Sequence, residues 1–384
     1  MKKKTRIKKF YKALFIVLVI VAAILFAIAF NKKTFKKIGY NKQEIAIIEK
    51  LTKEEQDIIL NHKYNKNIEG IINSGEYNKH KLDVYLTYME KYKNVNYLKI
   101  VKLVNNENFK EKSIDEYIPL LEKYDNVEGV ITYINEYKDK FELDQTTLNI
   151  LGGKYFIKDY IDRYVKYYKE HTDLSADEII TRINSNLDYT FYVDSKPADT
   201  SKGMYTLVNK YNHLSSTYVP SDLVQVDRRF THNNTKVVKI ANDNFVKLAE
   251  AGLAAGVHLL ATTCYRDYNF QSTLYYNYVN TDGVKNADTY SARPGSSEHQ
   301  LGYSLDLTNT SYVDFSNFVY TNEYKWLKDN AHKYGFILRY PEGKEYITGY
   351  IFEPWHIRYV GVDIATYIYE NNITYEEYYA YFLR

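Results

Sequence analysis

The chain has 384 residues, of which 45% are hydrophobic and 26% are charged. These fractions are ordinary for folded proteins, so wholesale disorder and a collagen-like structure are excluded, and the length allows two or three domains. The single cysteine, Cys264, excludes an internal disulfide bond. Tyrosine is abundant along the whole chain, with 43 residues, so a tyrosine near a candidate site is weak support for a function.

The N-terminal region is dominated by an uncharged apolar run at residues 13–30. As a helix this run would span about 27 Å, which is close to the hydrocarbon thickness of a bilayer. It has no polar face, and the following Asn31-Lys32-Lys33 is a poor signal-peptidase site. We therefore expect an uncleaved transmembrane anchor after a basic tail over residues 1–12. A cleaved signal peptide is the alternative.

Charge is distributed unevenly along the chain. Residues 1–37 hold 11 of the 51 basic residues and no acidic residue, so the rest of the chain carries 40 basic against 48 acidic residues. Seven of the 11 precede the apolar run, and the positive-inside rule therefore predicts a cytoplasmic N-terminus in the cell membrane and an extracytoplasmic remainder. The negative remainder excludes nucleic-acid binding. An exported protein without disulfides is typical of a Gram-positive-like bacterium.

Residues 38–193 are predicted to be helical, because apolar residues recur with a spacing near 3.6. The sequence of residues 90–95 returns in similar form at 122–127, 32 residues later, and a weaker third copy lies near 157–168. A period near 32 is typical of helix-turn-helix units that stack into a solenoid. We expect a stalk or spacer. A surface that binds a protein or glycan partner is the alternative.

Residues 194–203 are rich in turn-forming residues and predict a linker to a domain over residues 204–384. In that domain, helical and extended patterns alternate. Helices are expected near 245–253, 269–279, 323–334, 364–370 and 376–382, and strands near 257–264, 303–308, 336–340 and 350–359. This alternation predicts an α+β fold with a small antiparallel sheet and flanking helices.

Two short motifs in this domain combine residues that bind metals. The first runs from Ser297 to Asp306 and includes His299, and the second is Glu353-Pro-Trp-His356. Two imidazoles and one carboxylate suit zinc and leave a fourth position open for water, while a further carboxylate can accept a proton from that water. The motifs therefore predict His299, Asp306 and His356 as ligands of one Zn²⁺ and Glu353 as the base. The alternative is a pair of structural histidines beside a surface glutamate.

The order of these motifs resembles the VanY-type D-alanyl-D-alanine carboxypeptidases, which belong to a wider group with lysostaphin-type peptidases and Hedgehog. The resemblance covers about residues 205–375 and adds Tyr265-Arg266 and Gln271 to the two motifs. It implies the same three zinc ligands, with Glu353 as general acid and base. It also implies that Arg266 contacts the scissile carbonyl or the substrate carboxylate, and that Gln271 and Ser297 line the peptide site.

The expected function is a membrane-anchored, extracytoplasmic zinc carboxypeptidase that removes the C-terminal D-alanine from peptidoglycan stem peptides. An L,D-carboxypeptidase or an endopeptidase on the same peptides is the alternative within this class. A non-catalytic cell-wall scaffold is the alternative outside it. Cys264 stands where the family usually has a small residue, and we expect it to pack without a catalytic role.

Overall fold

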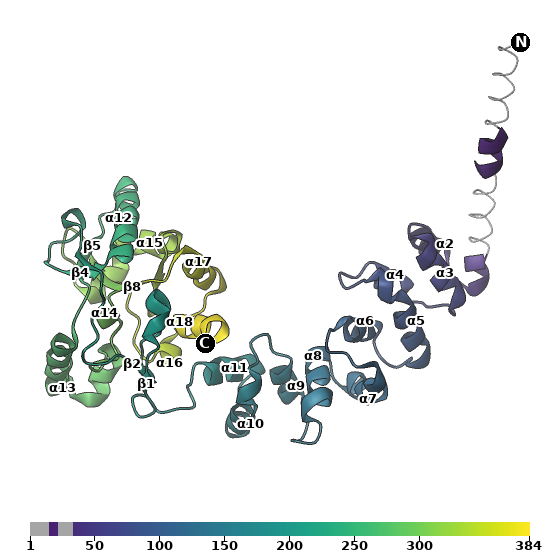
Figure 1. Cartoon of the computed structure of the whole chain (residues 1–384), viewed down its shortest axis with the longest axis horizontal. Helices are drawn as coiled ribbons and strands as arrows, with labels where there is room; N and C mark the ends of the chain where they lie inside the picture. The colour runs from purple at the N-terminus through teal and green to yellow at the C-terminus, as the bar shows by residue number, and fades with distance from the viewer. Residues whose placement is uncertain (1–14, 22–33) are drawn as a thin grey trace, which may run out of the picture. The chain divides into compact units, whose positions relative to one another are not determined.

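The computed structural model describes residues 15–21 and 34–384. The chain divides into two compact units, Met1–Phe156 and Ile157–Arg384 (Figure 1). Each unit has hydrophobic clusters of its own. The sequence places a domain linker at residues 194–203, which lie inside the second unit, and the finer division into domains stays a prediction.

The predicted membrane anchor over residues 13–30 is corrected by the structure. Within the part of the chain that the structure describes, no helix has the length and apolar content needed to cross a membrane. This finding contradicts the predicted single-pass membrane localisation. Residues 15–21 are helical. Residues 13–14 and 22–30, like the basic tail at 1–12, lie outside the described residues.

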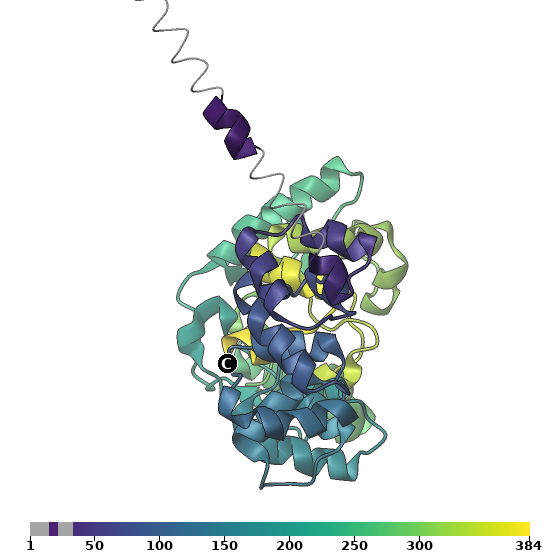
Figure 2. The same ribbon diagram turned by 90° about the vertical axis from the view of Figure 1, so that its right-hand side faces the viewer.

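The first unit is built from short helices that follow one another in chain order (Figures 1 and 2). Several begin at an Asn, Thr or Asp whose side chain accepts a hydrogen bond from the first helical turn, which satisfies otherwise unpaired N–H groups. The described helices are α2 (Lys42–Ile48), α3 (Lys53–Asn61), α4 (Ile68–Ile72), α5 (Leu82–Lys91), α6 (Tyr97–Asn105), α7 (Ile114–Lys123), α8 (Val127–Thr132) and α9 (Gln145–Leu151).

A buried tyrosine hydroxyl bonded to an asparagine from a following helix or turn recurs along the chain. The pairs are Tyr85 with Asn105, Tyr117 with Asn135 and Tyr164 with Asn184. The O···O distance is 2.8 Å in the second pair and 2.5 Å in the third. In both of these pairs the tyrosine oxygen also accepts a backbone N–H from seven residues earlier. The same local arrangement therefore occurs in both units.

The second unit mixes helices with small sheets. Its helices are α10 (Ile161–Glu170), α11 (Ala176–Asn184), α12 (Lys239–Ala254), α13 (Tyr268–Tyr290), α14 (Glu298–Leu301), α15 (Asn322–Asn330), α16 (Glu345–Thr348), α17 (Val362–Asn371) and α18 (Tyr375–Tyr378). Its strands are β1 (Lys196–Pro197), β2 (Asn212–His213), β3 (Leu223–Gln225), β4 (Lys236–Val238), β5 (Leu260–Thr263), β6 (Ser304–Thr308), β7 (Phe336–Leu338) and β8 (His356–Tyr359).

The largest described sheet has the strand order β5-β6-β8-β7 and is antiparallel throughout. Side chains alternate between its two faces. Leu305 and Leu307 of β6 and Ile357 of β8 enter the hydrophobic cluster that includes α12. Asp306 and His356 are thereby directed to the opposite face, where the candidate site lies.

Several predicted elements have other bounds in the structure; for example, the predicted strand at 257–264 is observed as β5, Leu260–Thr263. The predicted helix at 269–279 continues as α13 to Tyr290, past a non-helical Gly283. The predicted strand at 350–359 shrinks to β8, His356–Tyr359. Pro354 has no N–H to donate to a strand neighbour, and residues 351–355 form a loop and turn that carries Glu353.

Candidate active site

The register of two neighbouring strands brings the second and third predicted ligands together. Asp306 of β6 is paired directly with His356 of β8. Side chains of such opposite residues leave the same face of the sheet about 5 Å apart. Both side chains are almost fully buried. Local sheet geometry therefore places a carboxylate beside an imidazole without help from any loop.

His299 reaches the same place from the short helix α14, which precedes β6. The helix ends at Gly302, whose φ of +86° is in the left-handed region that favours glycine. A Cβ there would lie 2.9 Å from Pro220 and 3.0 Å from Val238, so larger residues are also excluded by space. This tight turn leads the chain from His299 directly into β6.

The three side chains form a compact group of donor atoms. His299 Nε2 is 3.3 Å from Asp306 Oδ2, and His356 Nδ1 is 3.3 Å from Asp306 Oδ1. One ligand atom from each of the three residues lies within 4.8 Å of the others. Tetrahedral zinc with bonds of about 2.0–2.2 Å holds its ligand atoms roughly 3.3–3.5 Å apart, so the spacing and the donor types fit zinc.

Hydrogen bonding leaves the required nitrogen of His299 available. Its Nδ1 lies 2.5 Å from the carbonyl oxygen of Cys264 and donates to it, which leaves Nε2 unprotonated. This Nε2 is buried and makes no hydrogen bond within the described chain. Burial, together with the charge of Arg266, lowers the pKa of His299 to about 4. The imidazole is therefore a neutral donor at neutral pH.

Glu353 lies beside the donor group, with its Oε2 3.4 Å from His356 Nδ1. Burial raises the pKa of Glu353 above its ordinary value of 4.5. For His356, burial works in the opposite direction, but the hydrogen bonds and charges of Asp306 and Glu353 prevail and raise its pKa to about 9. A buried carboxylate with a raised pKa is suited to accept and return a proton near neutral pH.

Arg266 follows β5 and is held against the site by its backbone, whose N–H donates to the His299 carbonyl at 3.4 Å. Its Nη2 is 3.9 Å from Asp306 Oδ2, and its buried Nε makes no hydrogen bond to any described residue. Gln271 donates its Nε2–H to the Ala292 carbonyl at 2.7 Å, and its buried Oε1 makes no such bond within the described chain.

A cleft of about 310 Å³ opens over these groups. All seven site residues predicted from the sequence line it: Arg266, Gln271, Ser297, His299, Asp306, Glu353 and His356. Aromatic side chains complete the walls, namely Tyr278, Tyr290, Phe315, Tyr340, Tyr350 and Trp355. The cleft thus combines a few convergent polar groups with an apolar surround, as small-molecule and peptide sites commonly do.

One wall of the cleft rests on residues that precede the two motifs. The Tyr350 hydroxyl is 3.2 Å from that of Tyr192, a tyrosine held at φ +62° in the left-handed region. The buried Lys210 Nζ lies 4.5 Å from the Tyr350 ring centre and donates to the carbonyls of Asp288 and Gly349. Sequence inspection missed this support, because its partners are far apart along the chain.

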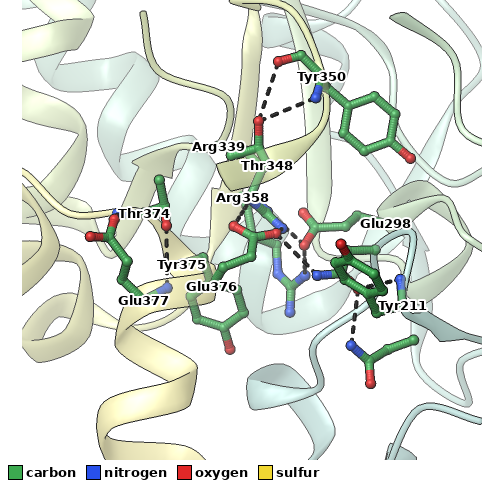
Figure 3. Close-up of polar contacts among 12 residues, drawn as sticks. Tyr211, Glu298, Arg339, Thr348, Tyr350, Arg358, Thr374, Tyr375, Glu376 and Glu377 are labelled. Atoms are coloured by element: carbon green, nitrogen blue, oxygen red, sulfur yellow. Dashed lines mark hydrogen bonds and ion pairs between the residues drawn. The ribbon is translucent and has the colours of Figure 1, made fainter. Parts of the chain in front are cut away.

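Sequence inspection also missed a buried ion cluster formed by Glu298, Arg339, Arg358 and Glu376 (Figure 3). Burial opposes ionisation of Glu298, but the charges of Arg339 and Arg358 outweigh it and lower the pKa of Glu298 to about 2. A signal was present in the sequence. Arg339 lies in the apolar run at 336–340, and a charge within a buried strand requires a partner.

Cys264 has no feature of a nucleophile. Its side chain is completely buried in the hydrophobic cluster of the sheet. Burial raises the pKa of its thiol well above the ordinary value, so the reactive thiolate is suppressed. Its contribution to the site is its carbonyl oxygen, which fixes the His299 ring.

Comparison with known proteins gives matches to the second unit. The family model described as VanY: D-alanyl-D-alanine carboxypeptidase matches residues 234–362. The putative carboxypeptidase YodJ of Bacillus subtilis is 38% identical over 206 residues, which cover 50% of this chain and 76% of that protein. A D-alanyl-D-alanine carboxypeptidase of Enterococcus faecalis is 31% identical over 198 residues, covering 49% of this chain and 70% of the relative.

Among solved structures, this chain is similar to a variant of the vancomycin-resistance D,D-pentapeptidase VanY from a VanB-type resistance cassette. That structure was determined in complex with Zn(II). The two chains are 32% identical, and the match covers 46% of this chain and 98% of the other, with a TM-score of 0.40.

Proposed function

Because this chain belongs to the VanY family of zinc-dependent D-alanyl-D-alanine carboxypeptidases, we propose that it removes the C-terminal D-alanine from peptidoglycan stem peptides. The observation that carries this proposal is the convergence of a three-residue donor set, a buried carboxylate and an arginine in one cleft. Nucleic acid has no part in this function.

The donor set supports the assignment of His299, Asp306 and His356 as the residues that would hold the metal. When bound, zinc would supply Lewis acidity toward the peptide carbonyl and make a water molecule more acidic. Asp306 would contribute a negative charge that compensates part of the metal charge. The remaining chemistry belongs to the side chains around this group.

Glu353 is proposed as the proton carrier. It accepts a proton from the attacking water and delivers it to the nitrogen of the departing D-alanine. Arg266 offers a fixed positive charge where the carbonyl oxygen becomes negative or where the substrate carboxylate binds. Such preorganised charge in a water-poor site can contribute several kcal/mol to the rate. Gln271 and Ser297 would position the peptide from the adjoining wall.

The test is the substitution Glu353→Gln, which keeps the shape of the side chain and removes its basicity. The variant should retain zinc and lose D-alanine release by about 10²–10⁴-fold, the usual contribution of a general acid and base. The substrate is a pentapeptide ending in D-Ala-D-Ala. The matched control is Glu342→Gln, which alters an exposed glutamate and should leave the rate unchanged.

Two outcomes would change the proposal. Release of D-alanine from a tetrapeptide and not from the pentapeptide would assign the enzyme to the L,D class with the same mechanism, and cleavage of cross-linked peptides would make it an endopeptidase. Failure of the zinc-loaded protein to cleave any of these substrates would leave the cell-wall scaffold as the better function. The roles of residues 38–193 as a spacer or as a protein-binding or glycan-binding surface stay predictions.

A further inference from the structure

A completely buried ion cluster lies behind His299 and His356. Arg339 donates its Nε–H to Glu298 Oε1 at 2.8 Å, and its two terminal nitrogens donate to the two oxygens of Glu376 at 2.9 and 2.6 Å. Arg358 Nη1 lies 3.0 Å from the same Glu298 oxygen. The four side chains, drawn in Figure 3, carry two positive and two negative charges. Burial of such a cluster is costly unless every charge is paired.

The two histidines differ in which ring nitrogen faces the donor group. His299 presents Nε2 and bonds Nδ1 to a backbone carbonyl. His356 presents Nδ1 to Asp306, so its Nε2 is on the far side of the ring, 4.0 Å from Glu298 Oε2. That Nε2 is buried and makes no hydrogen bond to a described residue. Glu298 Oε2 is the carboxylate oxygen paired with this nitrogen; at 4.0 Å it lies beyond hydrogen-bond distance, and it accepts a hydrogen bond from the Ser304 hydroxyl at 3.4 Å.

We propose that Glu298 is a positioning residue for His356: when the metal is bound, Glu298 receives the Nε2–H and so leaves Nδ1 as the ring nitrogen that faces the metal. Metal-binding histidines commonly donate their second N–H to a carboxylate or a carbonyl, which fixes both tautomer and ring orientation. Arg339 and Arg358 hold Glu298 in place through its other oxygen. This inference rests on the proposed function of the same site.

The cluster also connects the site to the C-terminal helix α18. Glu376 lies in α18, outside residues 234–362 that the family model matches. It pairs with the side of Arg339 that faces away from Glu298. The neighbouring Thr374 and Glu377 form a capping box that fixes the start of this helix. The C-terminal segment therefore balances the charge of Arg339, and Glu376 makes no ion pair with His356 within the described chain.

Glu298→Gln separates positioning from simple charge balance. Both arginines attract the single amide oxygen of the glutamine, so its NH₂ group takes the place of Oε2 and faces His356 Nε2. An NH₂ group can only donate, which favours the tautomer with the proton on Nδ1 and blocks that atom as a ligand. Glu376→Gln is the matched control, because it removes one negative charge from the same cluster at a residue that pairs with Arg339 and makes no ion pair with His356 within the described chain.

The experiment measures the zinc Kd of the full-length chain by competition with a chelator. Glu298→Gln should weaken zinc binding by about 10–100-fold, the usual effect of removing such a partner, whereas Glu376→Gln should leave the affinity close to that of the unaltered protein. The cobalt-substituted Glu298→Gln protein should also show an altered ligand-field spectrum. Equal zinc affinities for the two variants would overturn the inference.

A second measurement needs no variant in the cluster and remains decisive if Glu298→Gln does not fold. Long-range ¹H–¹⁵N correlation spectra of the zinc-loaded, histidine-labelled protein report which ring nitrogen carries the proton, with His356→Gln used for assignment. The expected proton is on Nε2 of His356 and on Nδ1 of His299. A proton on Nδ1 of His356 would refute the inference. Neither readout requires peptide cleavage, so a failure of the proposed function is recognised separately.

Discussion

Both units bury tyrosine–asparagine pairs, and the first unit also buries Glu44 and Glu55 against tyrosine hydroxyls, but the second unit adds a buried cluster of paired arginines and glutamates. In the first unit, neutral tyrosine and asparagine side chains pair across consecutive helical segments, 20 residues apart for Tyr85 with Asn105. In the second unit, four charged groups meet from distant parts of the chain, and Arg358 also donates to the carbonyl of Met204, 154 residues away. The first arrangement recurs along the chain, whereas the second surrounds one site.

This difference has energetic consequences. Loss of one partner from a buried neutral hydrogen bond costs about 1–3 kcal/mol. Loss of one partner from a buried ion pair costs about 3–5 kcal/mol, because an uncompensated charge remains in the interior. A neutral pair fixes the register of neighbouring helices with a small desolvation cost. A buried charge cluster has a larger desolvation cost, and here it adjoins the residues that would bind the metal.

Zinc removal should give the largest effect that distinguishes the two units. Since the donor group lies wholly in the second unit, zinc should stabilise that unit alone, by about 4 kcal/mol when free zinc exceeds its Kd 1,000-fold. For a unit of this size each kcal/mol shifts the melting temperature by roughly 2–4 °C. Calorimetry should therefore show two transitions, of which a chelator lowers one.

The control for this experiment is His356→Ala. In the presence of zinc, the second unit of this variant should melt at a lower temperature than in the unaltered protein, and the chelator should not shift that melting temperature. If the chelator lowered both transitions equally, the two units would unfold as one cooperative body, and the comparison between them would lose its basis.

Lys210 should give an intermediate effect that depends on pH. Burial lowers its pKa from 10.5 to about 8. Below pH 8 the amine is protonated in both folded and unfolded chains. Between pH 8 and 10.5 the unfolded chain binds more protons, so the stability of the second unit should rise with pH, by up to about 3 kcal/mol relative to Lys210→Met. Urea unfolding of both proteins at pH 7.5, 9 and 10 measures this difference.

The two proteins differ only at position 210, so the contributions of the other titratable groups to the pH dependence cancel. The change of the stability difference with pH therefore reports on Lys210. The charged neighbours of the amine are Asp288, which opposes the pKa shift, and Arg293, which reinforces it. A stability difference that stays constant from pH 7.5 to 10 would show that Lys210 keeps its ordinary pKa in the folded protein.

The sequence carried enough information for the local features of both units. Tyr85 and Tyr117 are 32 residues apart, the same offset as the echo of 90–95 at 122–127, and each donates its hydroxyl to an asparagine in the structure. Ser297 precedes the helix α14, His299 lies in it, and Asp306 lies in the strand β6 that follows after one turn. Such features could be predicted because the residues concerned are close in the sequence or form a recognisable family motif.

The support around the site could not be predicted in the same way. Glu298, Arg339 and Glu376 are separated by 41 and 37 residues in successive contacts, and no period or motif connects them. Lys210 donates a hydrogen bond to the carbonyl oxygen of Gly349, which is 139 residues later in the chain. A single sequence shows that Arg339 interrupts an apolar strand and needs a partner, but only the strand order brings the particular glutamates to it.

The smallest predicted effect concerns the neutral pairs, and it tests where the two units divide. Tyr117→Phe removes a buried hydroxyl and leaves the Asn135 oxygen without its donor, so it should destabilise the first unit by about 1–3 kcal/mol. Tyr164→Phe removes the equivalent hydroxyl in α10 and should destabilise the second unit by a similar amount. The chelator identifies the transition of the second unit.

As a control, Tyr92→Phe removes a bond to the exposed Asp115 and should change stability by less than about 0.5 kcal/mol. If Tyr164→Phe instead lowered the chelator-insensitive transition, α10 and α11 would unfold with the helical unit, and the third tyrosine–asparagine pair would belong to the same cooperative array as the first two.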